Sequence, residues 1–294
     1  MKKTVFTGSG VAIVTPFNEN GIDFDVLGKM LDWHVSEGTD AIIICGSTGE
    51  PSTMPDEEHI SAIEYTVKKI AGRIPVIAGT GSNDTPHAIK LAKAAEKAGC
   101  DGVLVVTPYY NKATPKGLYL HYKAIAESIS IPIILYNVPA RTGVNFSIDT
   151  LEKLAKIDNI VALKEASGDI AYLSHVAARV PELAIYSGND DMIIPAMSVG
   201  GVGVISVAAN LVPKYMHDMC KNYLDGNVKE AAKMQLDIMD LVDKLFIEVN
   251  PIPVKTAMNM VGWKVGSLRM PLCEMEESNA QKLHDSLARY GLLK

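Results

Sequence analysis

The sequence contains few cysteines, no excess of basic residues and no apolar run long enough to cross a membrane. Its 34 acidic side chains outnumber 28 basic ones, giving a formal net charge of −6, which disfavours nucleic-acid binding. The four cysteines form no Cys-x-x-Cys pair, so no disulfide framework is expected. The first residues, Met1–Phe6, lead directly into a Gly-Ser-Gly stretch without the apolar core of a signal peptide. We therefore expect a cytoplasmic protein that does not bind membranes.

Several signatures of metal and nucleotide chemistry are also missing. The sequence has no His-Glu-x-x-His motif, and its seven histidines lack metal-ligand spacing. Residues 79–84 lack the third glycine of a dinucleotide fingerprint, and no Walker A sequence is present. There is no Gly-x-Ser-x-Gly nucleophile elbow either. We expect neither a metal nor a cofactor.

Short apolar runs alternate with amphipathic helical patterns along most of the chain. Between the first two runs, for example, Phe24, Leu27, Leu31 and Val35 recur at helical spacing. Eight such units in a little over 200 residues predict an α/β fold, a (β/α)8 TIM barrel rather than an open doubly wound sheet. The predicted strands are Gly10–Val14, Ala41–Cys45, Val76–Gly79, Gly102–Val106, Ile133–Tyr136, Ile160–Lys164, Ala184–Ser187 and Gly203–Val207.

The pattern changes after about residue 225, where no convincing strand follows. A stripe that includes Met234, Leu241 and Val249 predicts one long helix over residues 232–249. Shorter helices are predicted near residues 253–261 and 274–290. We therefore predict a catalytic barrel over residues 1–225 and a small C-terminal helical domain over residues 226–294, which would serve packing and subunit contact.

Lys164 ends a run that is otherwise typical of a buried parallel strand. Burial disfavours a charged ammonium, and a neutral lysine amine is a nucleophile toward ketones. The alternative is a lysine that reaches solvent or pairs with a carboxylate. The strand alone leaves both interpretations open.

The other strand ends carry mainly hydroxyls, glycines and tyrosines, at the barrel end where active sites form. The Gly46–Gly49 loop could hold an anion with its backbone N–H groups, or it is an ordinary glycine-rich loop. Tyr136 could point inward and move protons, or be a core tyrosine bonded to a carbonyl. Arg141 could grip a carboxylate or make a surface salt bridge.

Five stretches give a more specific indication when they are taken together. They are Gly46–Glu50, Thr107–Asn111 (TPYYN), Tyr136–Gly143 (YNVPARTG), Gly203–Asn210 (GVISVAAN) and Asn250–Lys255 (NPIPVK). With Lys164-Glu165, they resemble the pyruvate-dependent class I aldolases, and most closely the dihydrodipicolinate synthase family, over nearly the whole chain. This resemblance implies a TIM barrel with a C-terminal helical domain, assembled as a homotetramer built from two dimers.

The resemblance also implies a role for individual side chains. Lys164 would form a Schiff base with pyruvate, and Tyr136 would shuttle protons, linked through Ser47 to Tyr110 of a neighbouring subunit. The family often has threonine where Ser47 stands, but the hydroxyl is retained. The implied substrate-binding residues are Thr48 for the pyruvate carboxylate, Arg141 for the carboxylate of aspartate-semialdehyde, and Gly188 and Ile205 as pocket lining.

The implied activity is condensation of pyruvate with L-aspartate-4-semialdehyde to 4-hydroxy-tetrahydrodipicolinate, which commits carbon to lysine and diaminopimelate. A sibling aldolase or lyase for N-acetylneuraminate or 2-keto-3-deoxy sugar acids stays open, although Arg141 favours the synthase. A barrel without catalysis is disfavoured by the complete residue set. Asp56 and His87 replace the histidine and glutamate of lysine-inhibited relatives, so lysine feedback is predicted to be weak or absent.

Overall fold

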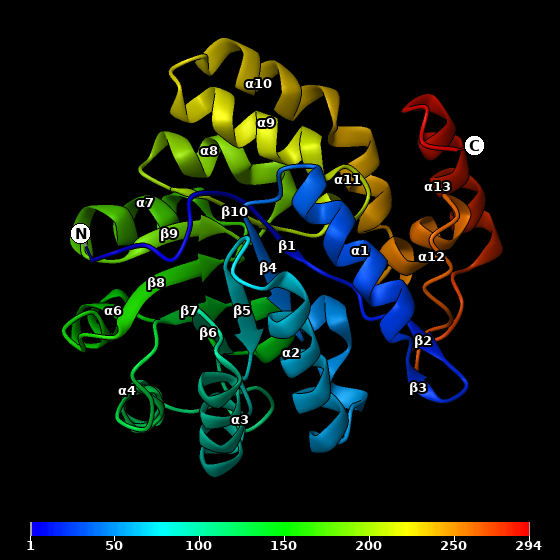
Figure 1. Cartoon of the computed structure of the whole chain (residues 1–294). Helices are drawn as coiled ribbons and strands as arrows, with labels where there is room; N and C mark the ends of the chain where they lie inside the picture. Colours follow the sequence, from blue (N-terminus) through cyan, green and yellow to red (C-terminus); the bar gives the residue numbers. More distant parts are fainter. Residues whose placement is uncertain (1, 294) are drawn as a thin grey trace.

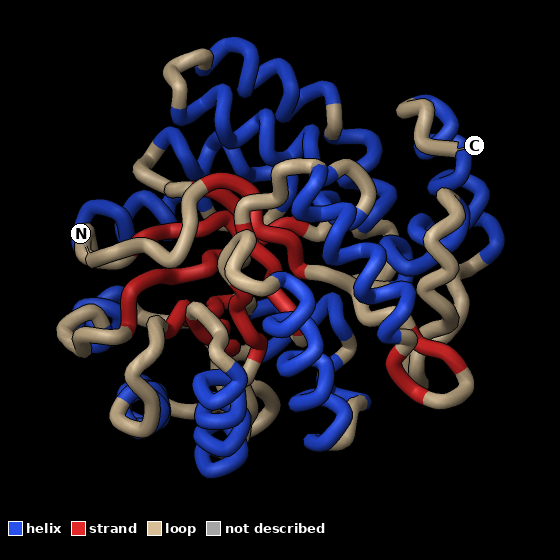
Figure 2. Tube along the Cα trace, viewed as in Figure 1, coloured by secondary structure: helices blue, strands red, loops and turns tan. Residues whose placement is uncertain are grey.

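The computed structural model describes residues 2–293 and has a closed parallel β-barrel at its centre (Figures 1 and 2). The strands follow the order β1-β10-β9-β8-β7-β6-β5-β4 around the barrel, which confirms the predicted TIM-barrel fold. A two-stranded antiparallel hairpin, β2 and β3, follows the first barrel strand. The barrel strands are β1 Gly8–Ala12, β4 Ala41–Ile44, β5 Val76–Gly79, β6 Gly102–Val106, β7 Ile133–Asn137, β8 Ile160–Glu165, β9 Ala184–Ser187 and β10 Gly203–Ser206, and the hairpin is β2 Phe17–Asn18 with β3 Gly21–Ile22.

Helices surround the barrel, and local sequence signals set their ends (Figure 2). Asp84 caps the start of α3 with its carboxylate, and Thr114 and Ser147 cap α4 and α6 with their hydroxyls. Gly99 ends α3 with a left-handed φ of 91°. The helices of this layer are α1 Phe24–Ser36, α2 Asp56–Ile70, α3 Thr85–Ala98, α4 Pro115–Ala126, α5 Pro139–Thr142, α6 Ile148–Leu154, α7 Ile170–Arg179, α8 Ile193–Ser198 and α9 Pro213–Leu224.

Two apolar layers form the core, because strand side chains alternate between the barrel interior and the helices. Ile43, Ile77 and Ile134 belong to the inner cluster. At the N-terminal end of the barrel, the ring of Phe6 stacks on Tyr186 at 4.4 Å between centroids, and the Tyr186 hydroxyl donates to the Phe6 carbonyl at 2.6 Å. These contacts fill one end of the barrel and leave the C-terminal strand ends for a site.

The C-terminal segment contains four helices, of which α12 and α13 lie to one side of the barrel (Figure 1). The predicted single helix over residues 232–249 was wrong: the structure has two helices that meet at Ile238 and end at Leu245. The break lets Gln235 bond to the backbone of Asp190 and Ile194, while Leu245 stays in the core. The helices are α10 Val228–Asp237, α11 Met239–Leu245, α12 Ile252–Met260 and α13 Glu277–Arg289.

The predicted domain boundary near residue 225 stays a prediction. α10 packs on α9 and α8 of the barrel layer, whereas α11, α12 and α13 pack on one another. Within residues 2–293 no helix is both long and apolar enough to span a membrane.

Candidate active site

Lys164 and Tyr136 lie next to each other inside the barrel. Strand pairing sets this arrangement, because Tyr136 on β7 is in register with Lys164 on β8. The Lys164 Nζ lies 4.3 Å from the centroid of the Tyr136 ring, and the two residues are only 5% and 7% exposed. None of the ion pairs formed across residues 2–293 includes Lys164. The lysine is therefore neither a solvated surface residue nor half of a salt bridge in the described part of the chain, and its role as a nucleophile stays a prediction.

Gly188 lies next to this lysine, and Ile205 belongs to the same inner apolar cluster as Tyr136. A Cβ atom built on Gly188 would lie 3.1 Å from Lys164 Cε and 2.6 Å from the Ala166 Cβ. Any larger residue would therefore press on the stem of Lys164. Ile205 lies on β10 and is fully buried in the inner cluster. The structure thus brings four of the predicted site residues together within the barrel.

The loop after β4 carries Ser47 and Thr48 in a short 3-10 turn. Thr48 is buried, and its hydroxyl accepts a hydrogen bond from the Asn250 side chain at 3.0 Å. Thr15 donates to the Gly49 carbonyl at 2.8 Å and fixes the turn from the β1 side. The loop predicted to bind an anion is therefore tightly held, and Ser47 within it is half-buried.

A cavity of about 470 Å³ opens at this end of the barrel. Val106 lines it and pairs in register with Tyr136, which puts the Tyr136–Lys164 pair next to the cavity wall. Arg141 also lines the cavity and donates from Nη2 to the Asn250 carbonyl at 2.8 Å. The cavity lining includes Ser47, Glu50, Val106, Tyr109, Val138, Arg141, Thr142 and Asn250.

Tyr110 is the predicted site residue that lies on the surface of the single chain. Its side chain is 90% exposed, and its backbone adopts a left-handed φ of 72°. Its neighbour Tyr109 does line the cavity. The predicted contribution of Tyr110 to a neighbouring subunit's site is untested and stays a prediction.

Two buried polar residues near the site were missed from the sequence. Asn250 bridges Thr48 and Arg141, and was noted only as part of a familiar motif. Asp190 accepts N–H bonds from Val207 and Ala208 at 2.9 and 2.8 Å, and so holds the end of β10. Burial raises the pKa of Asp190, while its hydrogen bonds and Lys164 oppose the shift. Neither residue stands out by periodicity, because each acts on a chain segment remote in sequence.

No cluster of three or more His, Cys, Asp or Glu side chains suited to a metal ion occurs in the described part of the chain. The polar side chains that line the cavity carry hydroxyls, the amide of Asn250, the carboxylate of Glu50, the imidazoles of His59 and His87, and the guanidinium of Arg141. The buried Lys164 amine lies beside Tyr136 and is not itself part of this lining. Such a set can bind carboxylates and form a covalent adduct with a carbonyl compound.

Comparison with known proteins agrees with this geometry. The family described as "Dihydrodipicolinate synthetase family" matches residues 5–290. A 4-hydroxy-tetrahydrodipicolinate synthase of Acetivibrio thermocellus is 55% identical over 297 residues, covering 100% of both chains. The crystal structure of dihydrodipicolinate synthase from Aquifex aeolicus superposes with a TM-score of 0.96 at 46% identity, covering 98% of this chain and 100% of that one.

A further solved structure includes a ligand. The chloride-inhibited dihydrodipicolinate synthase from Acinetobacter baumannii, complexed with pyruvate, has a TM-score of 0.96 at 43% identity and covers 99% of this chain and 100% of that one. The match extends over the barrel and the C-terminal helices alike. This chain belongs to the dihydrodipicolinate synthetase family.

Proposed function

We propose that this chain is a lyase that condenses pyruvate with L-aspartate-4-semialdehyde to give 4-hydroxy-tetrahydrodipicolinate and water. The observation that carries the proposal is the buried Lys164 beside Tyr136, whose partner on the next strand, Val106, lines a cavity together with Ser47 and Arg141. Full-length relatives named as this synthase support the same assignment.

Lys164 supplies the nucleophile. Its neutral amine attacks C2 of pyruvate, and loss of water from the adduct gives a protonated imine. The imine withdraws electrons, so the pyruvate methyl group loses a proton and becomes an enamine carbon. That carbon attacks the aldehyde, and the new alkoxide takes up a proton. The amino group of the acceptor then displaces Lys164 from C2, which closes the ring and returns the free lysine.

Proton transfers at several of these steps require a group close to the imine. Tyr136 is our candidate for this role, and its position is supported by the 4.3 Å between its ring centroid and the Lys164 Nζ. Ser47 lines the cavity and would extend the relay toward Tyr110 of a neighbouring subunit. Thr48 and the adjacent backbone N–H groups would hold the pyruvate carboxylate, and Arg141 would bind that of the acceptor.

The relay implies that the site is complete only in an oligomer, because Tyr110 is 90% exposed in the single chain. A homotetramer built as a dimer of dimers provides the second copy. The product feeds lysine and diaminopimelate synthesis, so the enzyme would work in the cytoplasm on small soluble substrates.

Reductive trapping tests the proposal directly. Borohydride added with pyruvate should inactivate the protein and attach a reduced pyruvyl group to Lys164, whereas Lys164→Met should remain unlabelled. A substrate panel with aspartate-semialdehyde and N-acetylneuraminate separates the synthase from a sibling lyase. Pyruvate-independent labelling, or labelling at another lysine, would refute the Schiff-base assignment.

A further inference from the structure

The loop that carries Ser47 and Thr48 is bounded by two residues in an unusual backbone conformation. Cys45 and Glu50 both have left-handed φ values, 55° and 57°, although neither is a glycine. Residues that carry a side chain rarely adopt this region of φ and ψ, so surrounding contacts must hold the backbone there. At Glu50 the loop turns from one 3-10 helix, Ser47–Gly49, into the next, Pro51–Thr53. The conformation of Glu50 therefore sets how the first turn is presented to the cavity.

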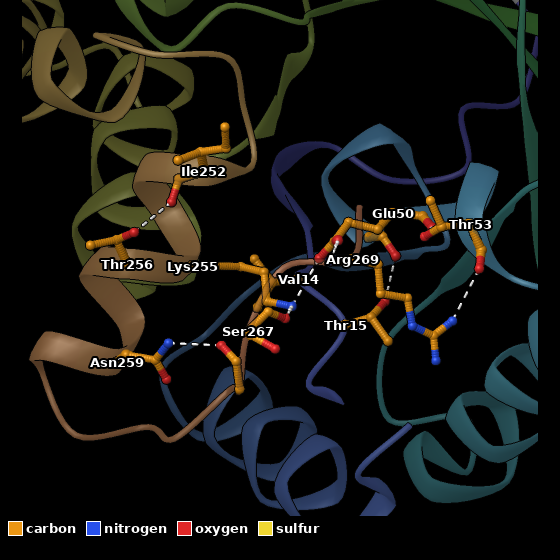
Figure 3. A network of polar contacts seen from close by, with 12 residues as sticks. Val14, Thr15, Glu50, Thr53, Ile252, Lys255, Thr256, Asn259, Ser267 and Arg269 are labelled. Atoms are coloured by element: carbon orange, nitrogen blue, oxygen red, sulfur yellow. Dashed lines mark hydrogen bonds and ion pairs between the residues drawn. The ribbon is translucent and has the colours of Figure 1, made fainter. Parts of the chain in front are cut away.

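Glu50 is held by a lysine that lies 205 positions further along the chain. Lys255, on α12, donates to Glu50 Oε1 at 2.8 Å, and both side chains are only 1% exposed (Figure 3). The Lys255 ammonium also donates to the Ser267 carbonyl at 2.8 Å. Burial lowers the pKa of Lys255, and the contact with Glu50 opposes that shift. A buried pair of this kind is costly to break from one side, because the remaining charge is left without a partner.

Arg269 closes the network from the same C-terminal segment (Figure 3). Its backbone N–H donates to Glu50 Oε2 at 3.0 Å, so both carboxylate oxygens of Glu50 are engaged. Its guanidinium binds both oxygens of Glu58 and donates to the Thr53 carbonyl at 3.1 Å. The Phe17 ring lies beneath both cations, 3.8 Å from the Arg269 Cζ and 4.6 Å from the Lys255 Nζ.

A third contact from this segment reaches the loop directly. Asn250 donates to the Thr48 hydroxyl at 3.0 Å and accepts from Arg141 at 2.8 Å through its carbonyl. Residues 250–269 therefore contact the loop at Thr48, Glu50 and Thr53. Two carboxylates face two cations in this network, which leaves it without net charge.

We infer that residues 250–269 act as a brace for the pyruvate-binding loop, with Glu50 and Lys255 as positioning residues for pyruvate. The inference rests on the proposed function, since it assigns Thr48 and its neighbouring N–H groups to the pyruvate carboxylate. The brace keeps these donors in the bound geometry before pyruvate arrives, so that little binding free energy is lost in ordering the loop.

A double-mutant cycle tests the brace, with the pyruvate concentration for half-maximal borohydride trapping as its readout. Lys255→Met keeps an aliphatic side chain but leaves the Glu50 carboxylate without its ion-pair partner. Glu50→Gln keeps the shape of the side chain but leaves the Lys255 ammonium without its ion-pair partner. Each single change should raise the half-saturating pyruvate concentration about tenfold or more. The double variant leaves no uncompensated charge and should show a smaller rise than the sum of the two.

Leu283→Ala is the matched control. Leu283 is fully buried on α13, so its truncation weakens the C-terminal helices without touching the loop. The thermal unfolding midpoint of this variant should fall, while its half-saturating pyruvate concentration should equal that of the wild type. If Lys255→Met and Glu50→Gln lost thermal stability but kept the wild-type half-saturating pyruvate concentration, the network would have only a structural role.

Hydrogen exchange on the unmodified protein provides a test that needs no variant. Saturating pyruvate should slow exchange in residues 46–54 and also in residues 250–269, because coupled sites stabilise each other reciprocally. Protection confined to residues 46–54 would overturn the brace. Absence of any pyruvate labelling of the wild type would instead refute the proposed function, so the two failures are distinguishable.

Discussion

Gly188→Ala should disturb Lys164, the proposed Schiff-base residue, through a single added methyl group. The new Cβ would lie 2.6 Å from the Ala166 Cβ and 3.1 Å from both the Glu165 carbonyl oxygen and Lys164 Cε. Carbon atoms prefer about 3.5–4.0 Å, so the overlap with Ala166 is about 1 Å. Two of these three atoms belong to the backbone or to a Cβ on it, so rotamer changes cannot relieve the clash and the end of β8 must shift.

The expected cost in unfolding free energy is about 1–3 kcal/mol, which is typical for an added methylene in a packed core. A displacement of Lys164 by several tenths of an ångström should in addition slow imine formation by about 10- to 100-fold. Urea unfolding measures the first effect, and the rate of pyruvate-dependent borohydride trapping measures the second.

Gly117→Ala is the control for this experiment. On α4 a Cβ would meet its nearest atoms at 3.5 Å, an ordinary contact, and replacing glycine by alanine in a helix favours the fold by about 0.5–1 kcal/mol. That variant should trap pyruvate at the wild-type rate. If Gly188→Ala also trapped at the wild-type rate with unchanged stability, the close packing of Gly188 on the lysine would have no consequence for catalysis.

Three further predictions follow from the site. Tyr136→Phe should lower kcat by about 10²–10⁴-fold with little change in thermal stability, since it removes a proton-transfer group and keeps the ring; near-normal turnover would leave the hydroxyl without a catalytic role. Arg141→Ala should reduce kcat/KM for aspartate-semialdehyde far more than pyruvate trapping at Lys164, and equal losses in both assays would indicate a structural arginine. Millimolar lysine should leave activity unchanged, because Asp56 is already paired with His87 at 2.8 Å and adds a negative charge to the region where a lysine carboxylate would bind; strong inhibition at low concentration would contradict this.

Local sequence determined the repeating plan of the fold. The apolar runs and amphipathic patterns predicted the barrel strands, and the local caps Thr114, Ser147 and Gly99 lie at the ends of their helices. Lys164 was identifiable for the same reason, because a charged residue is conspicuous in a buried strand. These features depend on residues within one turn or one strand of each other.

Tertiary structure decided which groups meet. Parallel pairing puts Tyr136 beside Lys164, and folding brings Asn250 to Thr48 and Lys255 to Glu50 across more than 200 positions. The break between α10 and α11 could not be predicted from the sequence either, because Gln235 on α10 bonds to a distant segment, the loop after β9. Periodicity records which face of an element is buried, but not which distant element covers it. Long-range partners are fixed only when the barrel closes and each buried polar group must find its counterpart.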